Sequence, residues 1–551
     1  MNRLLQILLC LLPAGLPHQS LAQSGMTSLP HLEKRGNAVQ MIVNDTPYLI
    51  LGGELHNSSA SSLRYLDSLW PRLEEAKLNT LLAPVYWGLM EPKEGTFDFQ
   101  LVDGLINQAR IHHVHLVLLW FGSWKNGQSS YAPSWVKHDT KRFPLVAIRG
   151  GAHLEILSPF GTETLKADST AFEALMRHLK AIDKTMHTVL MVQVENEVGI
   201  LGDTRDRSPL ADKAMNQPVP PSLLTYLETH QKTLRKEISE LWKKNGSRTS
   251  GNWKTVFGDS PATDELFMAW QYASFIDRVA AGGKAIYPLP FYVNAWIVQP
   301  ADKLPGDYPS GGPQAHLHDI WLAAAPHIDM FLPDIYLPDF EAICRQYREP
   351  GKGFFIPESR GSVKGAGNIL YALGAMHAMG YSPFGIDDPV DPRKDTLARL
   401  YGLLKGMAPW ILQAQQNGQM SAVVLNERHP EERISLGGYT LDVTLRHTWE
   451  TTKATSHGYV LILCTAPGQY YAVGADFQIT FFPGSGKGLA GLDHVEEGSF
   501  VQGTWQAGRT LNGDETANSV RLEKMARNGK TGMVARVGAS PGILKISVYT
   551  F

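Results

Sequence analysis

Up to about residue 390, short segments that are apolar throughout alternate with longer segments whose apolar residues recur every three or four positions. The longer segments, at 65–76, 102–111 and 171–186, have the spacing that places apolar side chains on one face of a helix. Strands that are apolar throughout and separated by helices predict a parallel sheet covered by helices on both faces. The candidate strands lie at residues 46–51, 78–87, 114–120, 188–192, 289–296, 328–336, 353–358 and 381–387.

Eight such strands are the number that closes a (β/α)8 barrel. A doubly wound open sheet is the alternative, but that fold normally begins with a glycine-rich nucleotide-binding turn. Gly52-Gly53, after the first strand, lacks that pattern. We therefore predict an α/β protein with a TIM barrel, which carries a charged helical insertion near residues 218–252.

From about residue 420 the pattern changes to short strands separated by Gly, Pro and Asn turns. This pattern predicts an all-β sandwich. We expect the barrel to occupy residues 23–415 and the sandwich residues 416–551. The candidate strands of the sandwich are 422–425, 439–445, 459–463, 470–473, 477–482, 532–537 and 543–548.

The N-terminus is organised like a secretory signal peptide. Arg3 precedes the apolar run 4–12, and small residues lie near Ala22 at the expected cleavage position. Residues 1–22 are thus predicted to direct export to the periplasm or the extracellular space. Because no later segment reaches the roughly 18 apolar residues of a membrane helix, we expect no membrane anchor.

Composition narrows the class of partner. The chain has 551 residues, is 43% hydrophobic and 19% charged, and carries a net charge of -2. It has no long basic or acidic run, which argues against nucleic acid or an anionic membrane surface as partner and is compatible with a neutral substrate.

Cys344 and Cys464 are the cysteines outside the signal, far apart in the sequence, and favour free thiols over a disulfide or a metal site. We expect no cofactor.

Acidic, amide and aromatic residues follow the predicted strands, whose C-terminal ends form the active face of a barrel. The fourth strand runs into the segment 193–199, Gln-Val-Glu-Asn-Glu-Val-Gly, and the seventh ends at Glu358. Two carboxyl groups facing each other there suit hydrolysis of a glycosidic bond, with one as proton donor and the other as nucleophile or activator of water. Further strand-end residues are Glu54, His56, Tyr86, Trp87, Trp124, Asn294, Trp296, Asp334, Tyr336 and Asp387.

Together these motifs resemble glycoside hydrolase family 35, the retaining β-galactosidases, and most closely its bacterial branch with an extra C-terminal β-domain. The resemblance extends over about residues 40–390. It implies an exo-glycosidase that releases terminal β-D-galactose from plant-type oligosaccharides or xyloglucan fragments by double displacement. The matching segments are Leu78-Asn79-Thr80, Val85-Tyr86-Trp87, Met90-Glu91-Pro92, Gly95-Thr96-Phe97-Asp98-Phe99, 193–199 and Pro357-Glu358.

The resemblance implies a role for each matching position. Glu197 would be the general acid/base, Glu358 the nucleophile and Glu195 a supporting acid. Asn196 would bond the sugar 2-hydroxyl, and Tyr336 would touch or orient the nucleophile.

Three further residues are candidate substrate contacts because of where they lie in the predicted barrel. Trp124 and Trp296 could be platforms for a sugar ring, with packing as the alternative. His56 could be a polar contact, or a histidine satisfied at the barrel mouth.

The sequence departs from the family at positions that usually contact galactose. Pro84 replaces a Tyr, Gly122-Ser123-Trp124 replaces Ala-Glu-Trp, Ser359-Arg360-Gly361 replaces an aromatic-rich segment, and His56-Asn57-Ser58-Ser59 replaces His-Tyr-Ser-Arg. The sugar contacts must therefore differ. A clan-related β-glucosidase, arabinosidase or endo-glycanase, and a non-catalytic carbohydrate-binding protein, stay open as alternatives.

Overall fold

The structure is a computed structural model that describes residues 28–360, 365–446, 454–511, 516 and 533–551. The predicted signal peptide lies outside this range and stays a prediction. Within the described ranges, no helix is both long and apolar enough to cross a membrane. Cys344 and Cys464 are buried free thiols.

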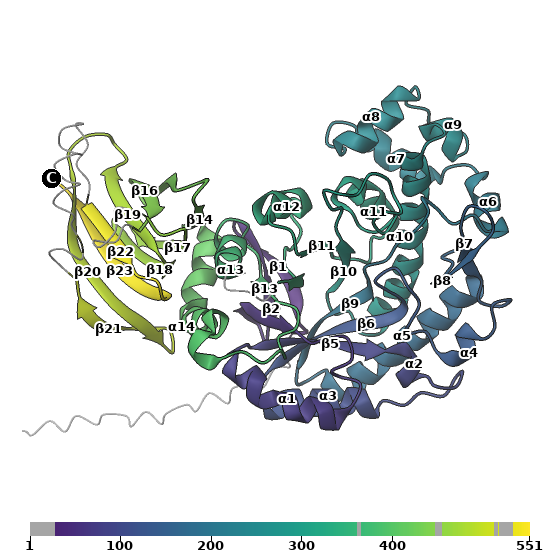
Figure 1. Ribbon diagram of the computed structural model, residues 1–551, viewed down its shortest axis with the longest axis horizontal. Helices are drawn as coiled ribbons and strands as arrows, with labels where there is room; N and C mark the ends of the chain where they lie inside the picture. Colours follow the sequence, from purple (N-terminus) through teal and green to yellow (C-terminus); the bar gives the residue numbers. More distant parts are fainter. Residues whose placement is uncertain (1–27, 361–364, 447–453, 512–515, 517–532) are drawn as a thin grey trace, which may run out of the picture.

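Eight parallel strands form a barrel in the order β12-β11-β10-β9-β6-β5-β4-β13 (Figure 1). Parallel bridges at Ile356–Tyr381 and Arg360–Phe384 close the ring. The predicted TIM barrel is confirmed. Its strands are β4 (Ile50–Glu54), β5 (Thr80–Tyr86), β6 (His115–Lys125), β9 (Val189–Asn196), β10 (Phe291–Trp296), β11 (Met330–Ile335), β12 (Glu358–Ser359) and β13 (Gly380–Tyr381).

The helices bury their apolar faces against these strands. In α1, for example, the Ser62 side chain caps the first turn by accepting from the Tyr65 amide, and Leu66, Trp70 and Leu73 face the core. The longer helices are α1 (Leu63–Glu75), α3 (Gln100–Ile111), α5 (Thr162–Asp183), α10 (Pro261–Ile286), α13 (Gly365–Gly374) and α14 (Thr396–Asn417). The shorter ones are α2 (Trp87–Met90), α4 (Ser134–Lys137), α6 (Pro209–Met215), α7 (Pro221–Thr229), α8 (Lys236–Lys244), α9 (Trp253–Phe257), α11 (His318–Ala324) and α12 (Phe340–Tyr347).

The first predicted strand is divided in the structure. Thr46–Tyr48 is β3, which pairs with β2 (Ala38–Val43) and, through it, β1 (His31–Arg35) in a small antiparallel sheet, and only Ile50–Glu54 enters the barrel. Asn44, between β2 and β3, meets His187 just before β9 at 2.7 Å. The small sheet therefore lies at the N-terminal end of the barrel, opposite the active face. A separate hairpin pairs β7 (Leu145–Ala147) with β8 (His153–Leu157).

The C-terminal part is a sandwich of two antiparallel sheets, as predicted. The larger has the order β14-β17-β18-β23-β20-β21 and the smaller β15-β16-β19-β22. The strands are β14 (Met420–Asn426), β15 (Glu431–Leu436), β16 (Tyr439–Leu445), β17 (His457–Ala466), β18 (Gln469–Ala475), β19 (Phe477–Pro483), β20 (Ala490–Val501), β21 (Thr504–Thr510), β22 (Met533–Val537) and β23 (Gly542–Thr550).

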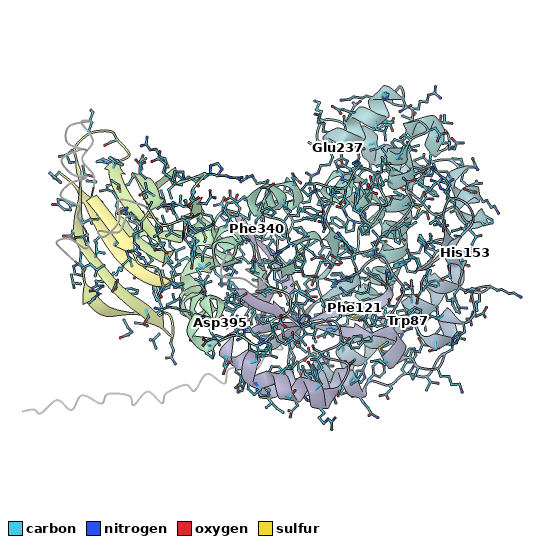
Figure 2. All side chains as sticks on the ribbon, viewed as in Figure 1. Trp87, Phe121, His153, Glu237, Phe340 and Asp395 are labelled. Atoms are coloured by element: carbon cyan, nitrogen blue, oxygen red, sulfur yellow. The ribbon has the colours of Figure 1, made fainter. Side chains whose placement is uncertain are left out.

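Strand β17 of the larger sheet is buried on both faces, since alternate side chains of a strand point to opposite sides. In β17, Val460 and Ile462 belong to the core between the two sheets, whereas Leu461 and Leu463 belong to the core shared with the barrel. Helices α13 and α14 lie between sheet and barrel in Figure 1. The sandwich is thus packed firmly against the barrel. Figure 2 shows how side chains fill the space between the elements of both parts.

Candidate active site

Strand β9 ends in a backbone that redirects its acidic side chains. Glu195 has φ 62° and Glu197 φ 45°, both in the left-handed region that few non-glycine residues adopt. Such conformations cost free energy and are found mainly at functional sites, where surrounding contacts hold them. Neighbouring loops supply those contacts here.

A tight turn after β6 holds the backbone of Glu197. Lys125 and Gln128 exchange hydrogen bonds of 2.8 and 3.0 Å, and the two residues between them, Asn126 and Gly127, have φ 53° and 63°. Asn-Gly is the sequence that such a type I′ turn favours, because both positions need positive φ. The Gly127 amide donates to the Glu197 carbonyl at 3.0 Å.

Glu195 braces the wall between β6 and β9. Its carboxyl accepts hydrogen bonds from the amides of Ser123 and Trp124, at 3.2 and 2.7 Å. It also meets the buried Asp168, which the Trp120 indole nitrogen contacts at 2.9 Å. Burial and the adjacent Asp168 raise the pKa of Glu195 well above its usual range, which favours a protonated Glu195 beside Asp168.

Four carboxyl groups from four strands come within electrostatic range of one another at the C-terminal face. They belong to Glu54, Glu197, Asp334 and Glu358, within one residue of the C-terminal ends of β4, β9, β11 and β12. Burial, and secondly the charge of Glu358, raise the pKa of Glu197 to about 7, while Lys125 opposes this increase. The same two causes hold the pKa values of Glu54 and Asp334 well above their usual range. With a pKa of about 7, Glu197 stays protonated up to nearly neutral pH, as a proton donor must.

Hydrogen bonds fix the groups around these acids. Asn294 accepts from the Glu197 amide at 3.0 Å and donates to Asp334 at 2.6 Å. The Tyr336 hydroxyl donates to Glu358 Oε1. Because burial and the Glu358 charge raise the pKa of Tyr336, this hydroxyl stays protonated and always serves as a donor to the carboxylate.

Several buried polar atoms at this face have no hydrogen-bond partner among the described residues. Both side-chain atoms of Asn196 are unpaired, as are Glu54 Oε1, Asp334 Oδ1 and Glu358 Oε2. An unsatisfied buried polar atom costs about 1–3 kcal/mol, so a cluster of them needs an explanation. A ligand rich in hydroxyl groups would satisfy them.

We expect Tyr336→Phe to lower kcat about 10- to 100-fold, because it removes a hydrogen bond to a charged group without changing the shape of the side chain. The protein should fold normally. Steady-state kinetics and the thermal unfolding midpoint check this. Tyr65→Phe is the matched control, since Tyr65 is 54% exposed on α1. Unchanged kcat in Tyr336→Phe would contradict a role in orienting Glu358.

The other predicted contacts divide into two groups. Trp124 is 1% exposed, donates to the Leu157 carbonyl at 2.9 Å and packs edge-on against Tyr272 and Phe275. This corrects the prediction of a sugar platform, because a buried indole presents no face to a ligand. Trp296 is half-buried at the end of β10 and stays a candidate.

His56 keeps an accessible ring at the barrel mouth. Its side chain is 45% exposed, with Nε2 2.9 Å from Asp388 and the ring edge-on to Phe384. Its amide donates to Asp387 at 3.1 Å, which ties the loop after β4 to the segment after β13. It stays a candidate polar contact.

Two residues of the site were not predicted from the sequence, Lys125 and Asp168. Asp168 lies inside α5, and Lys125 ends β6 one residue beyond the family motif. The Asn126-Gly127 turn was a usable signal for Lys125, since it predicts a fixed position beside the next strand. In the described ranges, no group of three or more His, Cys, Asp or Glu side chains could hold a metal ion.

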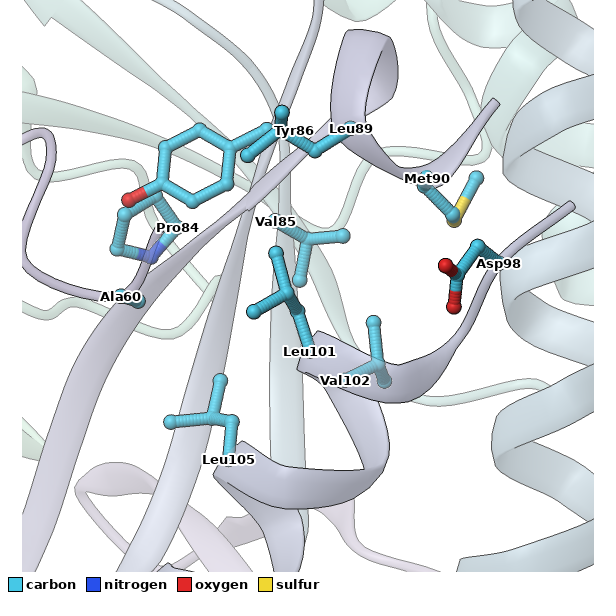
Figure 3. A pocket seen from close by; sticks show the side chains of 10 residues that line it. All are labelled: Ala60, Pro84, Val85, Tyr86, Leu89, Met90, Asp98, Leu101, Val102 and Leu105. Atoms are coloured by element: carbon cyan, nitrogen blue, oxygen red, sulfur yellow. The ribbon is translucent and has the colours of Figure 1, made fainter. Parts of the chain in front are cut away.

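Pro84, at the position where the family has a Tyr, lines a cavity between β5 and α3 (Figure 3). The cavity measures about 20 Å³, and its lining is mainly apolar. That is room for about one water molecule. This cavity is thus too small for a sugar.

Two sequence comparisons find proteins to which parts of the chain are similar. Residues 397–523 match the sequence model of a family described as a domain of unknown function (DUF5597). A stretch of 212 residues is 28% identical to β-galactosidase 8 of Oryza sativa subsp. japonica, and it covers 36% of this chain and 28% of the rice protein. Over that stretch the chain is a distant homologue of a plant β-galactosidase.

Solved structures share the fold over most of the chain. A catalytic mutant of Gan42B, a GH42 β-galactosidase from G. stearothermophilus, has a TM-score of 0.50 at 10% identity over 91% of this chain and 98% of that one. A β-galactosidase from Bacillus circulans sp. alkalophilus has a TM-score of 0.50 at 11% identity over 91% and 99%. The chain therefore shares the overall fold of these two β-galactosidases.

Proposed function

We propose that this protein is a retaining exo-glycosidase that releases terminal β-D-galactose, with Glu197 as general acid/base and Glu358 as nucleophile. The observation that carries the proposal is the contrast between the two acids. Burial and the charge of Glu358 raise the pKa of Glu197 to about 7, which keeps Glu197 protonated below neutral pH, whereas Glu358 accepts a hydrogen bond from Tyr336, which suits an anion. Two carboxyl groups in different protonation states are what double displacement requires.

In the first step, Glu197 protonates the glycosidic oxygen while a Glu358 oxygen attacks the anomeric carbon. The bond to the leaving group breaks and a glycosyl ester on Glu358 forms. In the second step, Glu197, now ionised, removes a proton from water, which attacks the anomeric carbon and releases Glu358. Two inversions give net retention. The unpaired Asn196 amide is suited to bond the sugar 2-hydroxyl.

The distant homology to a rice β-galactosidase supports galactose as the sugar, with plant oligosaccharides or xyloglucan fragments as natural sources. One observation favours a second candidate, another retaining β-glycosidase of the clan. Ser123 stands where the family has a galactose-contacting Glu, and its hydroxyl is buried and bonded to Asp168. That contact to galactose is therefore missing.

A panel of p-nitrophenyl β-glycosides tests the proposal. We expect the β-galactoside to be hydrolysed with kcat/KM at least about 10-fold above that of the β-glucoside and arabinoside. The first sugar anomer released, followed by NMR, should be β. Hydrolysis of the β-glucoside alone would exclude galactose as the preferred sugar and would leave the double-displacement mechanism intact. An α anomer would overturn double displacement.

The pH profile follows from the protonation state of Glu197. Because a pKa of about 7 belongs to the free enzyme, kcat/KM for an unactivated galactoside should fall as pH rises through about 7. In Glu197→Gln this basic limb should disappear, since the amide does not titrate. An unchanged basic limb in that variant would assign the titration to another group.

A further inference from the structure

Glu54 is a buried acid that the proposed mechanism does not use. It ends β4, is 2% exposed, and its Oε1 has no partner among the described residues. The charges of Glu358 and Glu197 both act on it. Its carboxyl group therefore shares the interior of the barrel mouth with the two proposed catalytic acids.

Lys125 is a buried cation in the same place. It is 6% exposed and lies beside Asn196 in the β6–β9 pairing. Its Nζ lies 5.1 Å from the ring centroid of Phe121, which Figure 2 labels. In the part of the chain that the structure describes, its ammonium makes no ion pair within 4.0 Å, although its charge acts on Glu54 and Glu197.

A buried ammonium and a buried carboxyl group that face each other without pairing are costly, because each loses water and gains no direct partner. The tight turn at Asn126-Gly127 fixes the backbone of Lys125 beside Glu197, because the Lys125 and Gln128 backbones bond to each other and the Gly127 amide donates to the Glu197 carbonyl. Glu54 Oε1 and the Lys125 ammonium thus retain free hydrogen-bonding capacity within electrostatic range of the two proposed catalytic acids.

We propose that Glu54 and Lys125 form a hydroxyl-binding pair that selects the terminal sugar, with Glu54 bonded to one ring hydroxyl and Lys125 donating to the same or the adjacent hydroxyl. This inference rests on the proposed glycosidase function. The pair would take the place of the sugar contact that Ser123 does not make, because the Ser123 hydroxyl is already bonded to Asp168.

The test removes the protein side chain, one hydroxyl of the sugar, or both. Glu54→Gln, Lys125→Met and the wild-type enzyme are assayed on the preferred nitrophenyl glycoside and on deoxy analogues that each lack one hydroxyl. Glu75→Gln and Lys141→Met, both exposed, are the matched controls. Glu54→Gln should lower kcat/KM about 10- to 100-fold on the parent glycoside. On one particular deoxy analogue the loss should be less than about 3-fold, because that sugar never made the contact.

Lys125→Met should also lower kcat/KM on the parent glycoside. Its loss should be smaller on the analogue that lacks the same hydroxyl or the adjacent one. The thermal unfolding midpoint of Glu54→Gln should not fall, since an unpaired buried carboxyl does not stabilise the fold. A loss of equal size on every analogue, or no loss at all, would overturn the inference and leave the glycosidase proposal intact. If the wild-type enzyme hydrolyses no glycoside of the panel, the proposed function and this inference fall together.

Discussion

Glu358→Ala is expected to lower kcat on aryl β-galactosides by on the order of 10⁴-fold or more, because no covalent intermediate can then form. The fold should tolerate the change. Among the described residues, the side chain of Glu358 makes a hydrogen bond only to Tyr336, and its Oε2 is unpaired. Steady-state and single-turnover kinetics measure the loss, and the thermal unfolding midpoint separates it from misfolding.

Azide makes this test specific for a nucleophile. It is small enough to enter the space that the removed carboxyl group leaves, and it can attack the anomeric carbon directly. One displacement inverts the centre, so the product should be the α-galactosyl azide, with partial recovery of rate.

The control is Glu75→Ala, which removes an exposed Glu at the end of α1. It should keep wild-type activity with and without azide. A Glu358→Ala enzyme that kept more than about a tenth of wild-type kcat would exclude the nucleophile role. A wild-type protein that bound galactose without turnover would instead identify the non-catalytic carbohydrate-binding alternative.

The barrel could be predicted because the side chains on both faces of its strands are mostly apolar, a pattern typical of buried parallel sheets. Helix α10 escaped prediction although it is the longest of the described helices. It packs against α5, and a Cβ at Gly283 would lie 2.4 Å from the Phe172 ring. Glycines that permit this close approach read as helix breakers in a sequence, and the broadly buried helix lacks a clear polar face.

In the sandwich, the missed strands are β15, β20 and β21. β20 changes register between Leu492 and His494 and again between Glu497 and Gly498. These irregularities break the alternation of apolar and polar residues that marks a strand. β15 and β21 lie at sheet edges and have mostly exposed or half-exposed side chains. They therefore lack the alternating buried apolar residues by which a strand is recognised in a sequence.

At the site, the positions of Glu197 and Glu358 follow from strand ends, but their surroundings do not. The positive φ of Glu195 and Glu197 depends on contacts from the β6 turn and from Asn294, which come from distant parts of the chain. The burial of Trp124 depends on α10, which supplies Tyr272 and Phe275. Because α10 was not predicted, Trp124 was expected to be accessible at the rim of the barrel.

The second large effect concerns the proton donor. Glu197→Gln should lower kcat/KM for a natural galactoside, whose leaving alcohol needs protonation, by about 10³-fold. For dinitrophenyl galactoside, whose leaving group departs as a stable anion, the loss in the first step should be less than about 10-fold. The comparison is made on one enzyme preparation, so misfolded protein affects both substrates equally.

Glu195→Gln is the matched control, since it makes the same substitution two residues earlier on β9 while its contacts lie in the β6–β9 wall. It should affect both substrates by the same factor, because bracing a wall does not depend on the leaving group. Azide added to Glu197→Ala on the activated substrate should give the β-galactosyl azide, since it intercepts the ester on Glu358 after a first inversion. An equal loss on both substrates in Glu197→Gln would leave the acid/base role without support, because only proton donation depends on the basicity of the leaving group.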